Sequence, residues 1–401
     1  MMSKNSKLLL VINTIRKIID IFLGPFLTAY LFKVAVDNIQ AISIYNIFSY
    51  MVIAIISLIL GKILKNKYEM EIFRLGMISK FIQLVILIML KENIVNYIWI
   101  LAIISGFSIE TWSFPLNLFS STLVSNDEKS SFVAYRTILN NLAKVLIPFL
   151  FGSIISANSF EKAAIIILIL SFIQILLSFK LNLKQRKDNE NKKLNVVEEY
   201  KKIKNNKKLK NFYKMKFFKG MAYEGALDTA VTLLIIITFN SDFSLGIITS
   251  IISVLAMISS YLYKKVKDNK SIKLLIKISS MIILITSILL VFITNQYTIV
   301  GYNLIFAFFL QFIIVTEETQ TLKFTNSDII TDSNRVETYV LLEFFLNLGR
   351  VISYILLFIV GIFNKLYLLE ILIIFLALSI VAETINLTKF VGNKEKALKK
   401  L

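Results

Sequence analysis

Apolar runs of about 20 residues recur along the whole chain, and this is the length that an α-helix needs to cross the hydrocarbon core of a bilayer. Of the 401 residues, 56% are hydrophobic and 18% are charged, which is more apolar surface than a single soluble core could bury. The pattern therefore predicts an all-α polytopic membrane protein with twelve transmembrane helices. The expected spans are 8–37, 42–64, 71–91, 96–122, 131–155, 161–183, 212–239, 243–264, 272–294, 297–322, 335–360 and 366–388.

The loops between these runs alternate in charge. One set is rich in lysine and arginine, while the other set is short and nearly neutral. By the positive-inside rule the basic set is cytoplasmic, which predicts a multi-pass protein of the cell (cytoplasmic) membrane with both termini inside. The net charge of +19 is thus explained by topology, and we expect no nucleic-acid partner. The basic loops carry Lys62, Lys65, Lys67, Arg74, Lys129, Lys264, Lys265, Lys267, Lys270, Lys323, Arg335, Lys394, Lys396, Lys399 and Lys400.

One long polar stretch, residues 184–211, separates six expected spans from the other six. This division predicts an N-terminal six-helix bundle over 1–183, a basic cytoplasmic linker over 184–211 and a C-terminal six-helix bundle over 212–401. We expect the linker to be solvated and to lie near anionic headgroups. The alternative is a regulatory or partner-binding segment.

The two halves share a motif. Asn141-Leu142-Ala143-Lys144 in the fifth span is followed 206 residues later by Asn347-Leu348-Gly349-Arg350 in the eleventh. The loops at 125–129 and 331–335 match at the same offset, and Leu60-Gly61-Lys62 matches Leu262-Tyr263-Lys264 at a slightly smaller one. Because six spans is an even number, the two copies have the same orientation. The sequence therefore predicts a parallel internal repeat.

Twelve spans in two halves, a long basic central loop and internal termini together resemble the major facilitator superfamily (MFS). The loop from Gly61 to Tyr68 keeps the first glycine and the basic character of the family pattern G-x-L-x-D-R-x-G-R-K, but not its Asp and second Gly. Pro148 and Gly152 stand in place of the antiporter pattern G-P-x-x-G-G, with a different spacing, so the sequence gives no support for antiport. The resemblance implies that spans 1, 4, 7 and 10 line a central cavity, with spans 2, 5, 8 and 11 beside them.

Polar and ionisable side chains interrupt the apolar spans, mostly on the helices that the resemblance places around this cavity. Such side chains are costly in a bilayer and mark functional sites unless they are paired. The candidate substrate and coupling residues are Arg16 and Asp20 in the first span, Glu110 and Trp112 in the fourth, Asn141 and Lys144 in the fifth, Glu224 and Asp228 in the seventh, Glu317 and Glu318 in the tenth, and Glu343, Asn347 and Arg350 in the eleventh.

Acids outnumber bases among the ionisable residues of these spans, with Arg136 of the fifth span included. The seven acids face four bases, Arg16, Arg136, Lys144 and Arg350, and a carboxylate without a partner in a low-dielectric medium tends to hold a proton. Because the chain has no His and no Cys, carboxylates are the expected proton carriers, and no metal or other cofactor is expected. Glu224 and Asp228 are one helical turn apart, where two carboxylates cannot both ionise cheaply.

Each candidate also has a structural interpretation. Arg16 and Asp20 are spaced for an ion pair within one helix. Lys144 and Arg350 could pair with Glu110 and with Glu317 or Glu318, or could bind an anion. Glu224 and Asp228 could pair with Arg16. The two adjacent glutamates of the tenth span could simply be solvated near the cytoplasmic mouth.

These features predict a secondary transporter that works by alternating access about a midplane site between its halves. We expect coupling to protons through Glu224, Asp228 and Glu110, and a small, cationic or amphipathic solute that is exported by a monomer. No glycine-rich phosphate loop occurs, so ATP hydrolysis is not expected. The alternatives are a lipid or glycolipid flippase, a membrane enzyme, and a non-transporting sensor or scaffold.

Overall fold

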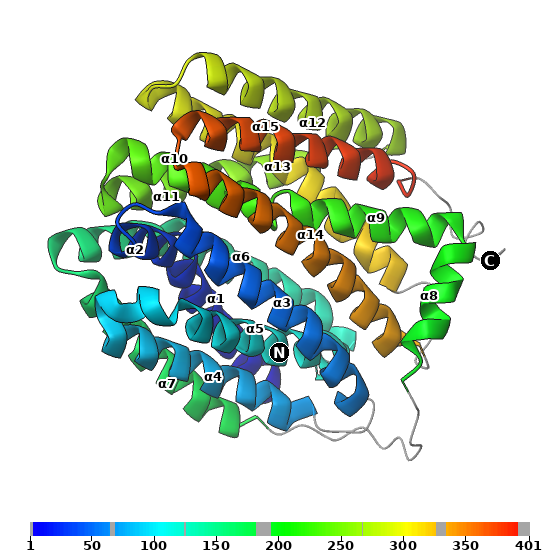
Figure 1. The fold of residues 1–401 in the computed structure, drawn as a ribbon. Helices are drawn as coiled ribbons and strands as arrows, with labels where there is room; N and C mark the ends of the chain where they lie inside the picture. Colours follow the sequence, from blue (N-terminus) through cyan, green and yellow to red (C-terminus); the bar gives the residue numbers. More distant parts are fainter. Residues whose placement is uncertain are drawn as a thin grey trace. The chain divides into compact units, whose positions relative to one another are not determined.

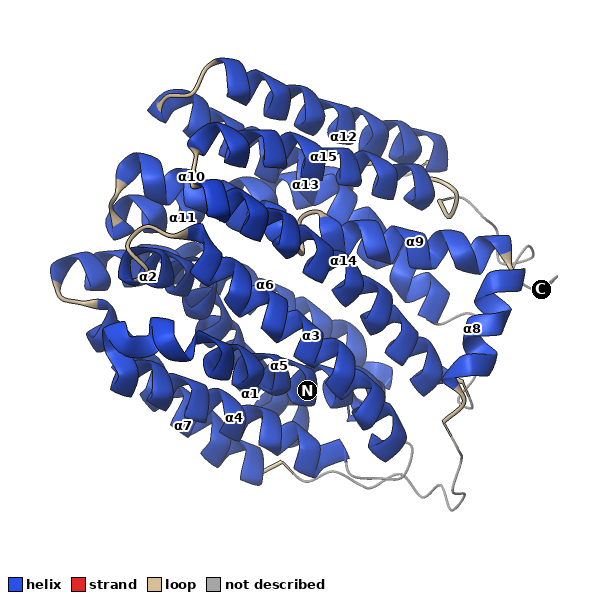
Figure 2. Ribbon diagram, viewed as in Figure 1, coloured by secondary structure: helices blue, strands red, loops and turns tan. Residues whose placement is uncertain are grey.

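The protein is all-helical. Its structure, a computed structural model, describes residues 3–64, 69–123, 126–181, 194–266, 268–325 and 334–391, without the side chains of 118–130. Every element in these ranges is a helix (Figure 2), which confirms the predicted class. Some sequence predictions lie outside the described residues or side chains: linker residues 184–193, the matched loops 125–129 and 331–333, and Lys65, Lys67, Lys129, Lys267, Lys394, Lys396, Lys399 and Lys400.

The helices follow the expected spans in chain order (Figure 1). The first part of the chain forms α1 (Lys4–Ile21), the π-helix η1 (Phe22–Phe26), α2 (Leu27–Val34), α3 (Ile39–Leu64), α4 (Glu69–Leu90), the 3-10 helix η2 (Lys91–Tyr97), α5 (Ile98–Leu123), α6 (Asn126–Ala157) and α7 (Phe160–Phe179). The second part forms α8 (Val196–Asn205), α9 (Lys207–Met221), α10 (Ala226–Phe239), α11 (Asp242–Tyr263), α12 (Asn269–Phe292), α13 (Gln296–Thr325), α14 (Arg335–Phe363) and α15 (Leu366–Leu387).

Ten helical stretches of the described chain are long and apolar enough to cross a membrane. One of them, Glu69–Asn117, is 49 residues long because η2 joins α4 to α5 without a break. Lys91 at the start of η2 has a φ of 46°, and α4 packs against α5, so the chain folds back on itself there. The segment α1–η1–α2 is not among the ten, and its π-helix contains Pro25, whose ring and missing N–H disturb the regular helix.

The seventh expected span is not one continuous helix. Helix α9 ends at Met221, residues 222–225 form a turn, and α10 begins at Ala226. The expected span over 212–239 is therefore present, as part of the stretch Lys207–Phe239, but the turn divides it into two helices. Gly225 lies in the turn, where a Cβ atom would collide with the α9 backbone and with the side chain of Ser353, so the close packing of the turn requires a glycine.

The chain forms two compact units, residues 1–193 with 239–250 (unit 1) and residues 194–238 with 251–401 (unit 2). In unit 1, α1 packs against α6 and α7, and α4 packs against α5 and α7. In unit 2, α9 packs against α14 and α15, and α12 packs against α13 and α15. The two units share this packing pattern when the six expected spans of each half are counted from one to six. In both units span one packs against spans five and six, and span three packs against spans four and six.

Candidate functional site

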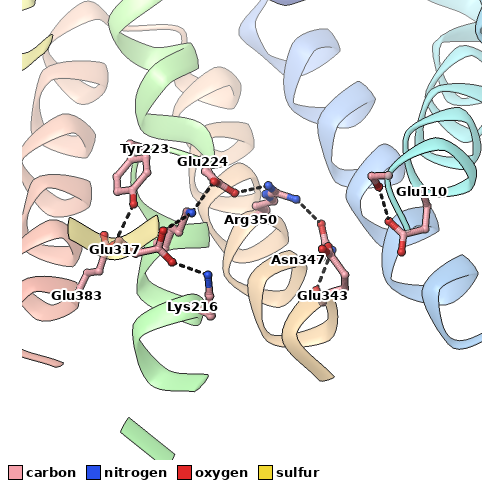
Figure 3. A network of polar contacts seen from close by, with 11 residues as sticks. Glu110, Lys216, Tyr223, Glu224, Glu317, Glu343, Asn347, Arg350 and Glu383 are labelled. Atoms are coloured by element: carbon pink, nitrogen blue, oxygen red, sulfur yellow. Dashed lines mark hydrogen bonds and ion pairs between the residues drawn. The ribbon is translucent and has the colours of Figure 1, made fainter. Parts of the chain in front are cut away.

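A network of buried ion pairs lies within unit 2 (Figure 3). It begins on α9, where Lys216 and Lys219 are three residues apart and so share one face of the helix. Both ammonium groups bind the carboxylate of Glu317 on α13, Lys216 in a very short contact and Lys219 at 2.8 Å between Nζ and Oε2. Lys216 also donates to the hydroxyl of Thr321 at 2.9 Å. Glu317 is 0% exposed, so all its charge is neutralised by protein groups.

The network continues from α9 to α14. Lys219 binds a second carboxylate, that of Glu224, at 2.9 Å between Nζ and Oε1. The other oxygen of Glu224 contacts the guanidinium of Arg350, which also donates to the side-chain oxygen of Asn347 at 2.9 Å. The amide of Asn347 in turn donates to a carboxylate oxygen of Glu343 at 3.2 Å. Charged groups from α9, α13 and α14 are thereby joined in one chain of contacts.

Two glycines bring α9 and α14 close enough for these contacts. A Cβ atom at Gly349 of α14 would lie 2.9 Å from the backbone nitrogen of Met221, and one at Gly220 of α9 would collide with the α14 backbone. Only the missing side chains allow the helices to approach so closely, as at small-residue crossings in other membrane proteins. Arg350 follows Gly349 directly and so reaches the turn that carries Glu224.

The turn at 222–225 also carries Tyr223. Its hydroxyl donates to Oε1 of Glu383 on α15 at 3.0 Å, and Figure 3 shows this pair next to Glu317. Glu383 is 0% exposed. Its other oxygen, Oε2, has no hydrogen-bond partner among the described residues.

In unit 1 the predicted pair of Arg16 and Asp20 is confirmed, with 3.1 Å between Nε and Oδ1. The guanidinium of Arg16 lies over the ring of Trp112, 5.2 Å from its centroid, and that ring stacks on Phe73 at 4.3 Å. Trp112 therefore covers the buried arginine and joins the apolar core of the unit. Glu110 is buried on the same helix, α5, and accepts a hydrogen bond of 3.4 Å from Ser113.

Sequence reasoning missed a buried lysine in unit 1. Lys80 of α4 is 2% exposed and donates to Oε1 of Gln83 at 2.9 Å. Gln83 donates to the hydroxyl of Tyr45 at 3.0 Å, and that hydroxyl donates to Ser105 at 2.9 Å. A lysine inside the apolar run 71–91 was the available signal.

Eight of the candidates lie either in the unit 2 network or in the cluster of Arg16, Asp20 and Trp112 in unit 1. Glu224, Glu317, Glu343, Asn347 and Arg350 lie in the unit 2 network, and Trp112 packs over the Arg16–Asp20 pair. The side chains of Lys144, Asp228 and Glu318 are exposed, and that of Asn141 is half-buried.

The partners of the buried charges agree only in part with the structural interpretations. Arg16 binds Asp20 as the intrahelical interpretation predicts, while Arg350 binds Glu224, a pair that the interpretations did not include. Glu317 is buried between two lysines instead of solvated. The expected excess of acids also shrinks, because the count omitted Lys216 and Lys219. Both lie near the start of the predicted span 212–239, three residues apart, which is the signal that could have revealed them.

Comparison with known proteins finds a protein family whose sequence pattern this chain shares. A sequence model described as Major Facilitator Superfamily matches residues 9–354. A search of curated proteins finds no significant match. Among the described residues no three Asp or Glu side chains gather as metal ligands.

Solved membrane transporters share the fold over nearly its whole length. A bacterial homologue of the iron transporter ferroportin in an inward-facing state matches with a TM-score of 0.69 and 11% identity, covering 97% of this chain and 98% of that one. The nucleoside transporter NupG matches with a TM-score of 0.69 and 12% identity, covering 98% and 100%. A bacterial metal transporter matches with a TM-score of 0.61 and 12% identity, covering 98% and 100%.

Proposed function

Because the chain belongs to the major facilitator superfamily, and is thus a multi-pass membrane transporter rather than an enzyme, we propose that it moves a small solute by alternating access, driven by protons. The observation that carries the proposal is the buried ion network of unit 2. Charged side chains in a membrane helix bundle mark substrate or ion pathways. Here they join three helices through pairs that can exchange partners when the helices shift.

Twelve crossings in two six-helix halves, over 1–183 and 212–401, fit the described helices. The 49-residue stretch Glu69–Asn117 would be about 74 Å long at about 1.5 Å per residue, more than twice the ~30 Å of the hydrocarbon core. It therefore supplies two crossings, and α1–η1–α2 supplies a further one. With the basic loops inside, both termini of the monomer are cytoplasmic in the cell membrane.

The proposed coupling residues are the acids Glu224, Asp228 and Glu110. Glu224 is bound by Lys219 and Arg350, so its role is to hold or release these cations. Asp228 is exposed and Glu110 is buried. The solute we propose is a cationic amphipathic compound that is exported, because exposed acids such as Asp228 and Glu318 would attract a cation.

Reconstitution in liposomes tests this function. Vesicles that contain a pH-sensitive dye are given a proton gradient and then a panel of solutes. The panel contains organic cationic dyes, sugars, amino acids and lipids, together with nucleosides, iron and other metal ions, because the transporters of similar fold are named for nucleosides, iron or metal. Proton movement that requires one of these solutes supports the proposal. Absence of solute-dependent proton movement with the whole panel contradicts proton coupling.

The coupling residues are tested in the same vesicles. Glu224→Gln and Asp228→Asn are expected to abolish proton movement, while Glu161→Gln, an acid in the first turn of α7 outside the networks, is expected to leave it unchanged. Full activity in both of the first two variants would remove these residues from the mechanism.

A further inference from the structure

Glu383 has fewer donors than the other acids of the unit 2 network, Glu224 and Glu317 above all. It lies on α15, is 0% exposed, and receives one hydrogen bond, from Tyr223. Its Oε2 atom has no partner in the part of the chain that the structure describes. A carboxylate has room for about four hydrogen bonds, and a buried charge with so few donors is strongly destabilising.

The neighbouring acids are well supplied with donors. Glu224 is bound by Lys219 and Arg350, and Glu317 is bound by two lysines and by the hydroxyl of Thr321. Glu343 receives one donor from Asn347 and is only partly buried. Glu383 is thus the acid of the network that is fully buried and has no cation in contact.

Charge balance leads to the same residue. The network contains three bases, Lys216, Lys219 and Arg350, and with Glu383 it contains four acids. The groups that act electrostatically on Glu383 are Tyr223, Lys219 and Glu224 from α9 and its following turn, and Glu317 from α13. The three bases balance the charges of Glu224, Glu317 and Glu343, so one proton on Glu383 makes the whole network neutral.

We propose that Glu383 is the residue that binds and releases the coupled proton, and that Tyr223 is its positioning residue. This inference rests on the proposed proton-coupled transport and names the proton site within it. In the protonated state Oε2 carries the proton and Oε1 accepts the tyrosine hydrogen bond. On release the O–H bond of the acid breaks, the proton leaves, and the tyrosine, which keeps its own proton, still donates to the carboxylate.

The turn at 222–225 links this proton to the ion pairs. Tyr223, which holds Glu383, and Glu224, which holds Lys219 and Arg350, are adjacent residues of the same turn. Any exchange of partners at Glu224 moves the turn and so changes the hydrogen bond at Glu383. The state of the proton and the state of the ion network therefore depend on each other.

Infrared difference spectroscopy tests the site without knowledge of the solute. The purified full-length protein in lipid vesicles is titrated while the C=O stretch of protonated carboxyl groups is recorded. We expect a titrating component of this signal that is lost in Glu383→Gln and kept in Glu370→Gln. Glu370 is a matched control, because it lies on the same helix, is 4% exposed and also accepts one hydroxyl hydrogen bond, from Thr294 at 2.7 Å.

A second variant tests the tyrosine. Tyr223→Phe removes the donor that stabilises the carboxylate, so the titration midpoint of the band is expected to move to higher pH by about one to two units. A merely structural role of Tyr223 would leave the midpoint unchanged, which would overturn its assignment.

Vesicle transport separates this inference from the proposed function. With a solute that moves protons in the native protein, Glu383→Gln should retain solute exchange across the membrane and lose proton-driven accumulation. If the infrared band survives in Glu383→Gln, or if proton-driven accumulation is undiminished, the inference is overturned while the transporter stands. If the native protein moves no protons with any solute, the proposed coupling itself fails.

Discussion

Replacing Glu317 by glutamine removes the carboxylate that neutralises two buried lysines. Lys219 keeps Glu224 as a partner, but Lys216, whose side chain is 9% exposed, loses its carboxylate and keeps neutral groups such as the hydroxyl of Thr321 and the ring of Phe212. Removing one partner of a buried ion pair costs about 3–5 kcal/mol, because a charge is left without compensation. No reduction for solvent screening applies, since both side chains of the pair are almost fully buried.

The expected change is large enough to measure by thermal unfolding. For a unit of roughly 150–250 residues, about 1 kcal/mol lowers the Tm by about 2–4 °C, so Glu317→Gln should lower it by roughly 6–20 °C. Circular dichroism of the purified protein in detergent follows the loss of helix. The control is Glu318→Gln, one residue further on and exposed, for which a change within about 0.5 kcal/mol is expected.

A double variant tests the reason for the effect. Adding Lys216→Met to Glu317→Gln removes the uncompensated cation, and replacing both members of a buried pair by neutral groups is often close to neutral for stability. Most of the lost Tm should therefore return. If Glu317→Gln and Glu318→Gln have equal Tm values, or if the double variant is less stable than Glu317→Gln alone, the reasoning from the buried charge is refuted.

Three further predictions follow from local geometry. Gly349→Ala should destabilise by about 1–3 kcal/mol, because its Cβ would collide with the α9 backbone. Gly301→Ala, with open space around it, should instead stabilise by about 0.5–1 kcal/mol. Equal Tm values for the two variants would contradict both expectations. Arg350→Lys should destabilise the protein by about 1–3 kcal/mol and lower the Tm accordingly. The reason is that one ammonium group cannot bind both the carboxylate of Glu224 and the side-chain amide of Asn347, which the guanidinium contacts together. An unchanged Tm would contradict this prediction. The hydrogen bonds from Ser271 lower the pKa of Asp268, the N-cap of α12. The charged Asp268 therefore stabilises the folded protein above the pKa of the unfolded state, and this stabilisation is lost as pH falls through the pKa of the folded state. The native protein and Asp268→Asn should accordingly differ in Tm at neutral pH, and the difference should vanish in acid.

The helical membrane architecture could be predicted from the sequence because it depends on local properties. A bilayer requires apolar runs of about 20 residues, and ten helical stretches of the described chain meet that requirement. The pair of Arg16 and Asp20 was equally predictable, since both residues lie on one helix and its regular geometry fixes their spacing. In these cases sequence separation alone sets the distance in space.

The partners of the buried charges were decided by the tertiary structure. Helical periodicity placed Glu224 and Asp228 on one face, but the break at 222–225 puts Glu224 in a turn and leaves Asp228 on the next helix. Which base then meets Glu224 depends on how closely α9 and α14 approach, and that distance is set by glycines 129 residues apart in the chain, Gly220 and Gly349. Which charges pair between two helices depends on how each helix is rotated about its axis and how far apart the two helices lie. Neither quantity is encoded by one helix alone.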